Sequence, residues 1–410
     1  MAVLGVDFGT SNSAAGVAVN GAPHLIAMEP GASTLPTAVF FPEGGAMRIG
    51  SRAVAALTDG DDGRYMQALK SLLGTPLLYE ERRFGRRRMS FADIVTGFLS
   101  EVKTRSEAAT GLQFNHALSG RPVHFHSRDA ARDAQAEADL RQCYHAAGFD
   151  EVRFLYEPEA ALRAAPSRAG LGLIVDIGGG TTDFTVFRQG AGAPEILASY
   201  GVRLGGTDLD RRLSIAHVMP LLGKGTAIRD SFGQGTLPAP NRIFNDLATW
   251  QMIPFLYAPE ARRAVADLRR GAVDPAPLQR LQGVLEDELG HDLAFAVERG
   301  KILCNREGTA RIGLGVIEPG LGCDLTRAAM EHSLHEELAQ IRAAAAEALA
   351  QGGVDPAQVT RLVMVGGSSL LHAVRRDLQT LCPGAQIESD NALTAVADGL
   401  ALAAETAFAE

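Results

Sequence analysis

Short apolar runs bounded by turn residues alternate along the chain with longer segments in which apolar residues recur every three or four positions. The short runs are typical of strands and the longer segments of helices. Turn signals at Asn20-Gly21 and at Glu29-Pro30-Gly31 divide the first 41 residues into a meander of strands. The elements expected before residue 165 are strands at 3–7, 14–19, 24–28, 38–41 and 121–125, and helices at 64–73, 91–109, 128–147 and from 157 onward.

The second half repeats this order and then becomes mainly helical. An apolar hairpin is expected at 171–186, and an apolar strand at 361–365 leads into a glycine turn that a helix follows. The other expected elements are a strand at 196–204, helices at 208–219, 324–351, 393–408 and from 371, a surface loop at 223–240, and mainly helical chain at 241–306.

Two segments share one pattern, in which an apolar strand ends in an aspartate and glycines follow: 3–13 with Asp7, and 171–186 with Asp176. Glycines let the backbone turn with positive φ and approach an anion, and an aspartate beside such a turn can hold water-ligated Mg²⁺. One segment alone is compatible with an ordinary hairpin. A matched pair, 176 − 7 = 169 residues apart, favours a nucleotide phosphate clamp between two related lobes.

Length and charge narrow the class of protein. A chain of 410 residues is expected to form at least two lobes, and 46% hydrophobic with 21% charged residues is typical of a globular protein. The net charge of −9 disfavours non-specific binding to nucleic acid. Five arginines at 82–88 are a local exception, interpreted as a solvated hairpin turning at Gly85 or as a docking site for an acidic partner.

Cysteine usage and the N-terminus bear on the compartment. The four cysteines are scattered without C-x-x-C spacing, so neither a disulfide framework nor a zinc site is indicated. No secretory leader and no long apolar run are recognised. We therefore expect a cytoplasmic protein that binds neither a membrane nor nucleic acid.

Six motifs lie in order along the chain: Val3-Leu-Gly-Val-Asp-Phe-Gly-Thr-Ser-Asn-Ser13, Ala68-Leu-Lys-Ser-Leu-Leu-Gly74, Tyr156-Glu-Pro-Glu-Ala-Ala161, Asp176-Ile-Gly-Gly-Gly-Thr-Thr-Asp183, Leu204-Gly-Gly-Thr-Asp-Leu-Asp210 and Val365-Gly-Gly-Ser368. In order and approximate spacing they resemble the ATPase domain of the heat-shock protein 70 (DnaK-like) chaperones, over nearly the whole chain. The Gly120–Phe125 segment is most similar to the YegD-like branch. The resemblance implies an α/β, actin-like ATPase fold with two lobes, duplicated core sheet-plus-helix subdomains, peripheral subdomains and a central nucleotide cleft.

The resemblance also assigns roles to individual residues. It implies ATP or ADP with Mg²⁺ as cofactors, and K⁺ as a further candidate ion. The implied catalytic residues are Lys70, Glu157, Asp176 and Thr181, and the implied metal-binding residues are Asp7, Asp176 and Asp183. The implied nucleotide-binding residues are Gly9, Thr10, Ser11, Asn12, Gly178, Gly179, Gly180, Thr181, Gly205, Gly206, Glu298, Lys301, Gly366, Gly367 and Ser368.

Three positions depart from the family pattern. The two arginines that sandwich adenine in the family are matched by Ile302 and Leu370, so cation–π stacking is lost and apolar packing replaces it. Thr207 stands where the family has a glutamate, which removes an acidic group near the cleft. Weaker adenine affinity or a relaxed choice of base is expected.

The expected domains are a first lobe at 1–165, a second lobe at 166–392 with a mainly helical peripheral subdomain at about 217–306, and a C-terminal helix at 393–410 near the first lobe. No peptide-binding domain is expected after it. Pro122 resembles the family's switch proline near the interlobe hinge, although a proline in a strand is also compatible with a simple edge breaker.

These observations favour a chaperone-type ATP-binding protein, a weak Mg²⁺-dependent ATPase that signals its nucleotide state by interlobe closure to an unknown protein partner. A nucleotide-binding scaffold without hydrolysis is one alternative. A small-molecule kinase of the sugar and acetate kinase class is another, because those kinases share the phosphate clamp. A filament-forming, actin-type role and the oligomeric state also remain open.

Overall fold

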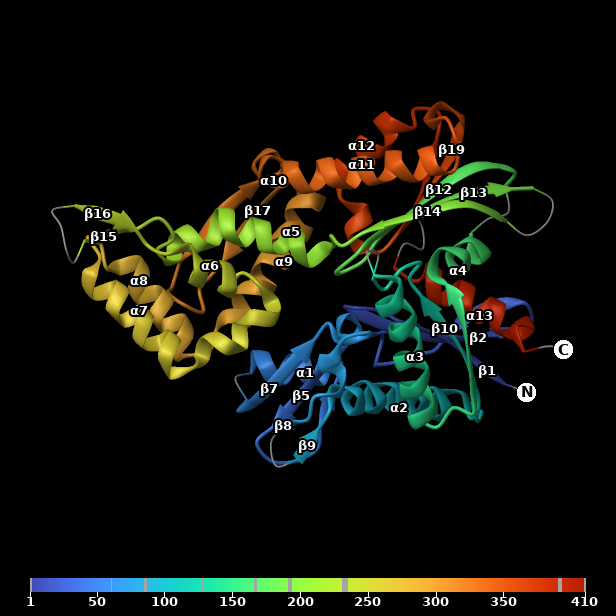
Figure 1. Ribbon diagram of the computed structural model, residues 1–410, viewed down its shortest axis with the longest axis horizontal. Coiled ribbons are helices and arrows are strands. Elements are labelled where there is room, and N and C mark those ends of the chain that lie inside the picture. Colours follow the sequence, from blue (N-terminus) through green and yellow to red (C-terminus); the bar gives the residue numbers. More distant parts are fainter. Residues whose placement is uncertain are drawn as a thin grey trace. The chain divides into compact units, whose positions relative to one another are not determined.

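The computed structural model describes residues 2–59, 61–84, 87–126, 129–165, 168–190, 194–230, 235–389 and 393–408. The chain divides into two compact units, one of Met1–Gly205 with Ile341–Glu410 and the other of Gly206–Gln340 (Figure 1). In the described residues, no helix combines the length and the apolar character needed to cross a membrane.

Two sheets with the same strand order form the first unit. Each joins an antiparallel meander of three strands to two parallel strands, in the orders β3-β2-β1-β10-β11 and β14-β13-β12-β19-β20. The strands of the first sheet are β1 (Val3–Phe8), β2 (Asn12–Val19), β3 (Ala22–Leu25), β4 (Thr34–Pro36, paired with β2), β10 (His116–Arg121) and β11 (Glu151–Tyr156). Those of the second are β12 (Gly170–Ile177), β13 (Thr182–Gln189), β14 (Glu195–Val202), β19 (Val359–Val365) and β20 (Gln386–Glu388). The expected duplication of the core is therefore present.

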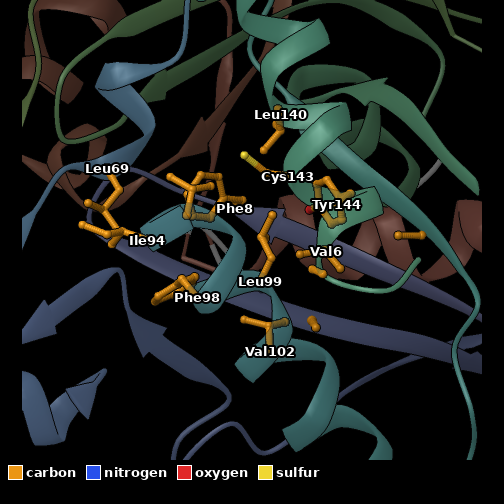
Figure 2. Packing of buried hydrophobic residues seen from close by; sticks show 14 of the residues in the cluster. Val6, Phe8, Leu69, Ile94, Phe98, Leu99, Val102, Leu140, Cys143 and Tyr144 are labelled. Atoms are coloured by element: carbon orange, nitrogen blue, oxygen red, sulfur yellow. The ribbon is translucent and has the colours of Figure 1, made fainter. Parts of the chain in front are cut away.

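Helices α2 (Phe91–Thr110) and α3 (Ala130–Ala146) contribute to the core of the first sheet. In α2, apolar residues recur at helical spacing, Ser90 caps the N-terminus in a reciprocal bond with Asp93, and Gly111 ends the helix at φ 71°. Figure 2 shows Val6 and Phe8 of β1 among side chains of both helices. The strand that ends near Asp7 is thereby fixed from one side.

A second core cluster joins both sheets. Helices α4 (Glu157–Ala164) and α13 (Ala395–Ala407) lie side by side and pack with Leu118 of β10 and with β12, β13 and β19 (Figure 1). A Cβ atom at Gly399 would overlap the carbonyl oxygen of Ala160, so the two helices approach backbone to backbone. Glu157, the first residue of α4, is thus placed by a tightly packed helix pair.

Smaller elements complete the first unit. They are β5 (Ala38–Pro42), β6 (Arg48–Ile49), β7 (Gly63–Gln67), β8 (Arg82–Phe84), β9 (Arg87–Met89), α1 (Ser51–Thr58), η1 (Leu69–Leu72), η2 (Pro76–Tyr79), η6 (Pro356–Gln358), η7 (Gly367–Leu370) and α12 (His372–Leu381). β8 and β9 pair as expected for the arginine-rich hairpin, and Gly85, where its turn was expected, lies outside the described residues.

Helices dominate the second unit. Its elements are α5 (Gly206–Leu213), η3 (Ser214–Val218), η4 (Met219–Leu222), β15 (Ala227–Arg229), β16 (Thr236–Pro238), α6 (Asn241–Leu247), η5 (Trp250–Tyr257), α7 (Pro259–Gly271), α8 (Ala276–Glu286), α9 (Gly290–Glu307), β17 (Thr309–Gly313), β18 (Gly322–Thr326) and α10 (Arg327–Ser333). Helix α11 (His335–Gln351) follows. The expected surface loop at 223–240 contains a short hairpin, β15 with β16.

Three expected elements were wrong. The helix expected at 64–73 is limited to the 3₁₀ helix η1 at Leu69–Leu72, because 63–67 pair with β5 and Ala68 adopts the left-handed conformation at φ 59°. The strand expected at 121–125 lies instead at His116–Arg121. It pairs there with β1 and β11, and Pro122 ends it. The helix expected at 324–351 is divided, because 322–326 pair with β17 and buried Leu334 separates α10 from α11.

Candidate functional site

An ion pair between Lys70 and Glu157 lies at the centre of the candidate site. Lys70 Nζ is 2.6 Å from Glu157 Oε1, and the two side chains are 9% and 13% exposed. Lys70 lies on η1, directly after the left-handed Ala68. Glu157 follows β11 without interruption and begins α4, with Pro158 in the first turn. Residues from two different elements therefore meet in a desolvated pair.

Three aspartates of the two sheets surround this pair. Asp7 lies near the end of β1, while Asp176 of β12 and Asp183 of β13 are opposite each other in the antiparallel ladder. The charges of Lys70 and Glu157 act on all three carboxyl groups. The equivalent strands of the duplicated sheets thus bring Asp7 and Asp176 to one site.

Burial and the neighbouring charges shift the pKa values of this cluster. Burial, reinforced by the Glu157 carboxylate and opposed by Lys70, raises the pKa of Asp7 and of Asp183 to about 7. The same causes raise the pKa of Asp176 well above its ordinary value. Burial alone would lower the pKa of Lys70, but the carboxylates of Glu157 and Asp7 outweigh it, and the pKa is raised. Four acidic groups face one amine, so the site favours an additional cation.

Several glycines of the turns leave no room for a side chain. A Cβ at Gly9 would overlap the Asn12 carbonyl oxygen, and one at Gly179 would overlap Ser11 Oγ. The first turn and the second turn are therefore in close contact. Gly366, at φ 78°, lies against the Ile177 carbonyl, and a Cβ at Gly205 would lie 2.5 Å from the Gly179 backbone.

Hydrogen bonds shape the second turn. The Gly178 amide donates to the Thr181 carbonyl at 3.0 Å, and the Thr181 and Asp183 side chains share a hydrogen bond that opposes the rise in the pKa of Asp183. Gly180 has no heavy atom within 4 Å of the position where a Cβ would stand, so the backbone is open to a ligand there. The Gly178 amide is used within the turn, so the open side of the turn lies at Gly180.

No group of three or more His, Cys, Asp or Glu side chains among the described residues converges closely enough to ligate a metal directly. The carboxyl groups nevertheless fit a divalent cation, because they outnumber Lys70 and a cation would offset the repulsion from neighbouring carboxylates that helps to raise their pKa. Such a donor set suits an ion that keeps much of its water, as Mg²⁺ does.

Several chaperone proteins are similar in sequence to this chain. A family model described as Hsp70 protein matches residues 77–230. The chain is 26% identical over 420 residues to the chaperone protein DnaK of Cenarchaeum symbiosum, which covers 98% of this chain and 54% of that protein. Chaperone protein dnaK1 of Synechocystis sp. is 26% identical with the same coverage. The chain is similar to Hsp70/DnaK-type chaperones over nearly its whole length. Its two duplicated sheets agree with the actin-like ATPase fold that this similarity implies.

Other Hsp70-type relatives align over a shorter stretch. The chaperone protein DnaK of Thermoplasma acidophilum is 32% identical over 224 residues, 52% of this chain and 34% of that protein. The two relatives that align with 98% of this chain are about twice as long, and the chain spans 54% of each of them.

Two of the residues implied by the Hsp70 resemblance, Glu298 and Lys301, lie on α9 in the second unit. Lys301 is 5% exposed, and its Nζ lies 2.8 Å from Asp210 Oδ1 and 3.5 Å from the Gly206 carbonyl oxygen. Asp210 ends the motif Leu204–Asp210, but its pairing with Lys301 was not anticipated. Ile302, at a position where the family has an arginine, is 56% exposed.

The remaining implied residues follow strands β1 and β19 in the first unit. Thr10 and Ser11 join β1 to β2, which Asn12 begins, and the Ser11 carbonyl accepts a hydrogen bond from the Thr37 amide at 2.8 Å. Gly367 and Ser368 lie on η7, directly after β19 and Gly366.

Proposed function

We propose that the chain binds ATP and ADP with Mg²⁺ and hydrolyses ATP slowly. The observation that supports this most directly is the buried Lys70–Glu157 pair among Asp7, Asp176 and Asp183, at the ends of two equivalent strand pairs. Phosphoryl transfer depends on positioning and on stabilising charge, and this site offers a fixed amine, carboxylates and two glycine turns.

Each group has a distinct task in this proposal. The turns at Gly9–Asn12 and Gly178–Thr181 contact the phosphates through backbone amides and hydroxyls. Lys70 provides a point charge at the transferred phosphate, and Glu157, Asp176 and Thr181 orient the attacking water. Bound Mg²⁺ would neutralise phosphate charge, and Asp7, Asp176 and Asp183 would hold its water shell. K⁺ is a further candidate for the acidic cluster.

The output of the site would be a conformational signal. We propose that closure of the lobes, 1–165 and 166–392, reports the nucleotide state to a protein partner. The relatives are named chaperone proteins, which supports a chaperone-type role for this chain. The boundaries of the lobes belong to the same proposal.

Calorimetric titration of the full chain with ATP and with ADP, in Mg²⁺, tests binding, and phosphate release from the same samples tests hydrolysis. We expect binding that Asp176→Asn weakens, and slow release that Lys70→Ala abolishes. Lys103→Ala is the matched control, because Lys103 on α2 pairs with Glu107 outside the site. Release that survives in Lys70→Ala would remove Lys70 from the mechanism.

A second candidate function is a scaffold that binds nucleotide without hydrolysis. Lys301 pairs with Asp210, and Ile302 stands where the family has a stacking arginine, so we expect weaker contacts to the nucleoside than in the family. Binding without phosphate release would favour it. Transfer of phosphate to a sugar or an acid in excess of release to water would instead favour a small-molecule kinase.

A further inference from the structure

The segment that carries Lys70 has an irregular backbone. Ala68 at φ 59° precedes η1, and Gly74 at φ 73° ends it before η2. The left-handed conformation is unfavourable for a residue with a Cβ. A segment of this shape keeps its conformation only when neighbouring elements hold it.

A buried carboxylate on α3 holds this segment. Asp139 is 1% exposed and accepts hydrogen bonds from the Gly74 amide at 2.8 Å and the Tyr79 hydroxyl at 2.6 Å. Gln135, one turn earlier on α3, donates to Asp139 Oδ1 at 2.7 Å. Two of these three donors belong to the segment after Lys70. Hydrogen bonds to a charged acceptor are about twice as strong as those between neutral groups.

Further contacts hold the same stretch of backbone. His126 Nε2 is 2.8 Å from the Leu73 carbonyl oxygen, and Arg132 Nε donates to the Gly74 carbonyl at 3.3 Å. A Cβ at Gly74 would overlap the Arg132 carbonyl oxygen, so the segment lies directly against α3. Figure 2 shows Leu69 and Leu140, the neighbours of Lys70 and Asp139, in one apolar cluster.

We infer that Asp139 is a positioning residue for Lys70. It acts through Gly74 and Tyr79, holding 69–79 against α3 so that the Lys70 amine stays at Glu157. The kinetic part of this inference rests on the proposed ATPase function, whereas the structural part does not. Tyr79 allows the structural part to be tested with little disturbance of the core. Its ring is half exposed, and its hydroxyl donates the hydrogen bond to Asp139.

Two variants of the full chain, Asp139→Asn and Tyr79→Phe, test the inference. Tyr257→Phe is the matched control, since its hydroxyl donates to the Glu288 carbonyl and accepts from the Gly290 amide in the second unit. The readouts are amide hydrogen exchange of 69–79, the affinity for ADP, and the rate of single-turnover hydrolysis.

We expect exchange at 69–79 to accelerate about fivefold in Tyr79→Phe, which loses one hydrogen bond, and about tenfold or more in Asp139→Asn, which weakens the bonds from both the Gly74 amide and the Tyr79 hydroxyl. Hydrolysis slows by similar factors, whereas the affinity for ADP stays within about twofold. Tyr257→Phe should leave both the exchange at 69–79 and the rate of hydrolysis unchanged. Conserved exchange at 69–79 in both variants, or hydrolysis lowered no more than in Tyr257→Phe, would overturn the inference.

The design separates failure of the inference from failure of the proposed function. If the wild type releases no phosphate, the ATPase proposal fails, and exchange at 69–79 still decides whether Asp139 holds the segment. If Asp139→Asn does not fold, Tyr79→Phe decides the question, because it removes one hydroxyl from a half-exposed ring.

Discussion

Lys70 Nζ lies 2.6 Å from Glu157 Oε1 although 87 residues separate the two in the chain. Neither residue lies inside a regular helix or strand that would place it by local periodicity alone. Lys70 is on a 3₁₀ turn held by α3, and Glu157 is at the first position of a helix held by α13. The distance between Lys70 and Glu157 therefore depends both on the packing of η1 against α3 and on the packing of α4 against α13.

Removal of one partner from this pair is expected to destabilise the protein. Lys70→Met leaves Glu157 and three aspartates buried without an amine, which costs about 3–5 kcal/mol of unfolding free energy. Glu157→Gln costs less, because Lys70 keeps Asp7 and Asp176 as neighbours. Urea unfolding of both variants and of the double variant should show a coupling of about 1–3 kcal/mol. Strict additivity would mean that the pair contributes nothing to stability.

The raised pKa of Asp183 predicts that stability falls as pH rises. The folded group titrates near pH 7, whereas an unfolded aspartate titrates near 3.9. Its contribution is fully present below about pH 4 and is lost as pH rises through 7, because the folded state binds the proton more tightly. Asp183→Asn should therefore match the wild type near pH 4 and exceed it above pH 7, by on the order of 2–4 kcal/mol.

Thermal unfolding in the presence of a chelator, at a series of pH values, measures this difference. Added Mg²⁺ should reduce the difference at high pH, since it compensates the wild-type charge and not that of the variant. An advantage of Asp183→Asn that is constant across pH would show that its cause is not ionisation.

Gly180 offers a test of the phosphate turn. A Cβ there meets no atom of the protein, so Gly180→Ala should change the free energy of unfolding by less than about 0.5 kcal/mol. If phosphate occupies that space, affinity for ADP should fall at least about tenfold, a loss of 1.4 kcal/mol. Gly313→Ala on β17 is the control, with equally open surroundings and no expected effect on binding. Unchanged binding in Gly180→Ala would place the phosphates elsewhere.

The contact between α4 and α13 predicts a large difference between two similar substitutions. Gly399→Ala forces a methyl group into the Ala160 carbonyl oxygen and should destabilise the fold by about 3 kcal/mol or more. Gly283→Ala on α8 meets open space and should stabilise by up to about 1 kcal/mol. Guanidinium unfolding of both variants measures this contrast. Equal effects would mean that α13 can shift away from α4 at little cost in free energy.

Local sequence patterns predicted the duplicated strands and the places of the glycine turns, because strand periodicity is a property of a few adjacent residues. Gly111, for example, ends α2 at the expected place. The positive φ expected in the two phosphate turns was wrong, since Gly9, Gly178, Gly179 and Gly180 have none, and close approach of backbone and side-chain atoms explains Gly9 and Gly179 instead. The same reasoning failed at 64–73, where pairing with β5 overrides helical spacing. Asp139 gave no signal, since its partners are 65 and 60 residues away and depend on how α3 packs. Asp210 could have been noticed from its place in the Leu204–Asp210 motif. Its pairing could not, because its partner Lys301 lies 301 − 210 = 91 positions later.

Helix α13 has a consequence for how the protein is made. Its backbone at Ala401 lies against Gly5 of β1, where a Cβ would be 2.7 Å from the Ala401 nitrogen, and the two residues are 401 − 5 = 396 positions apart. At ribosomal rates of about 5–20 residues per second, β1 waits on the order of 20 to 80 seconds for this helix. During that interval the face of the first sheet that α13 later covers is open to misassociation, so synthesis speed and the protection of that face decide how much of the chain reaches its native fold.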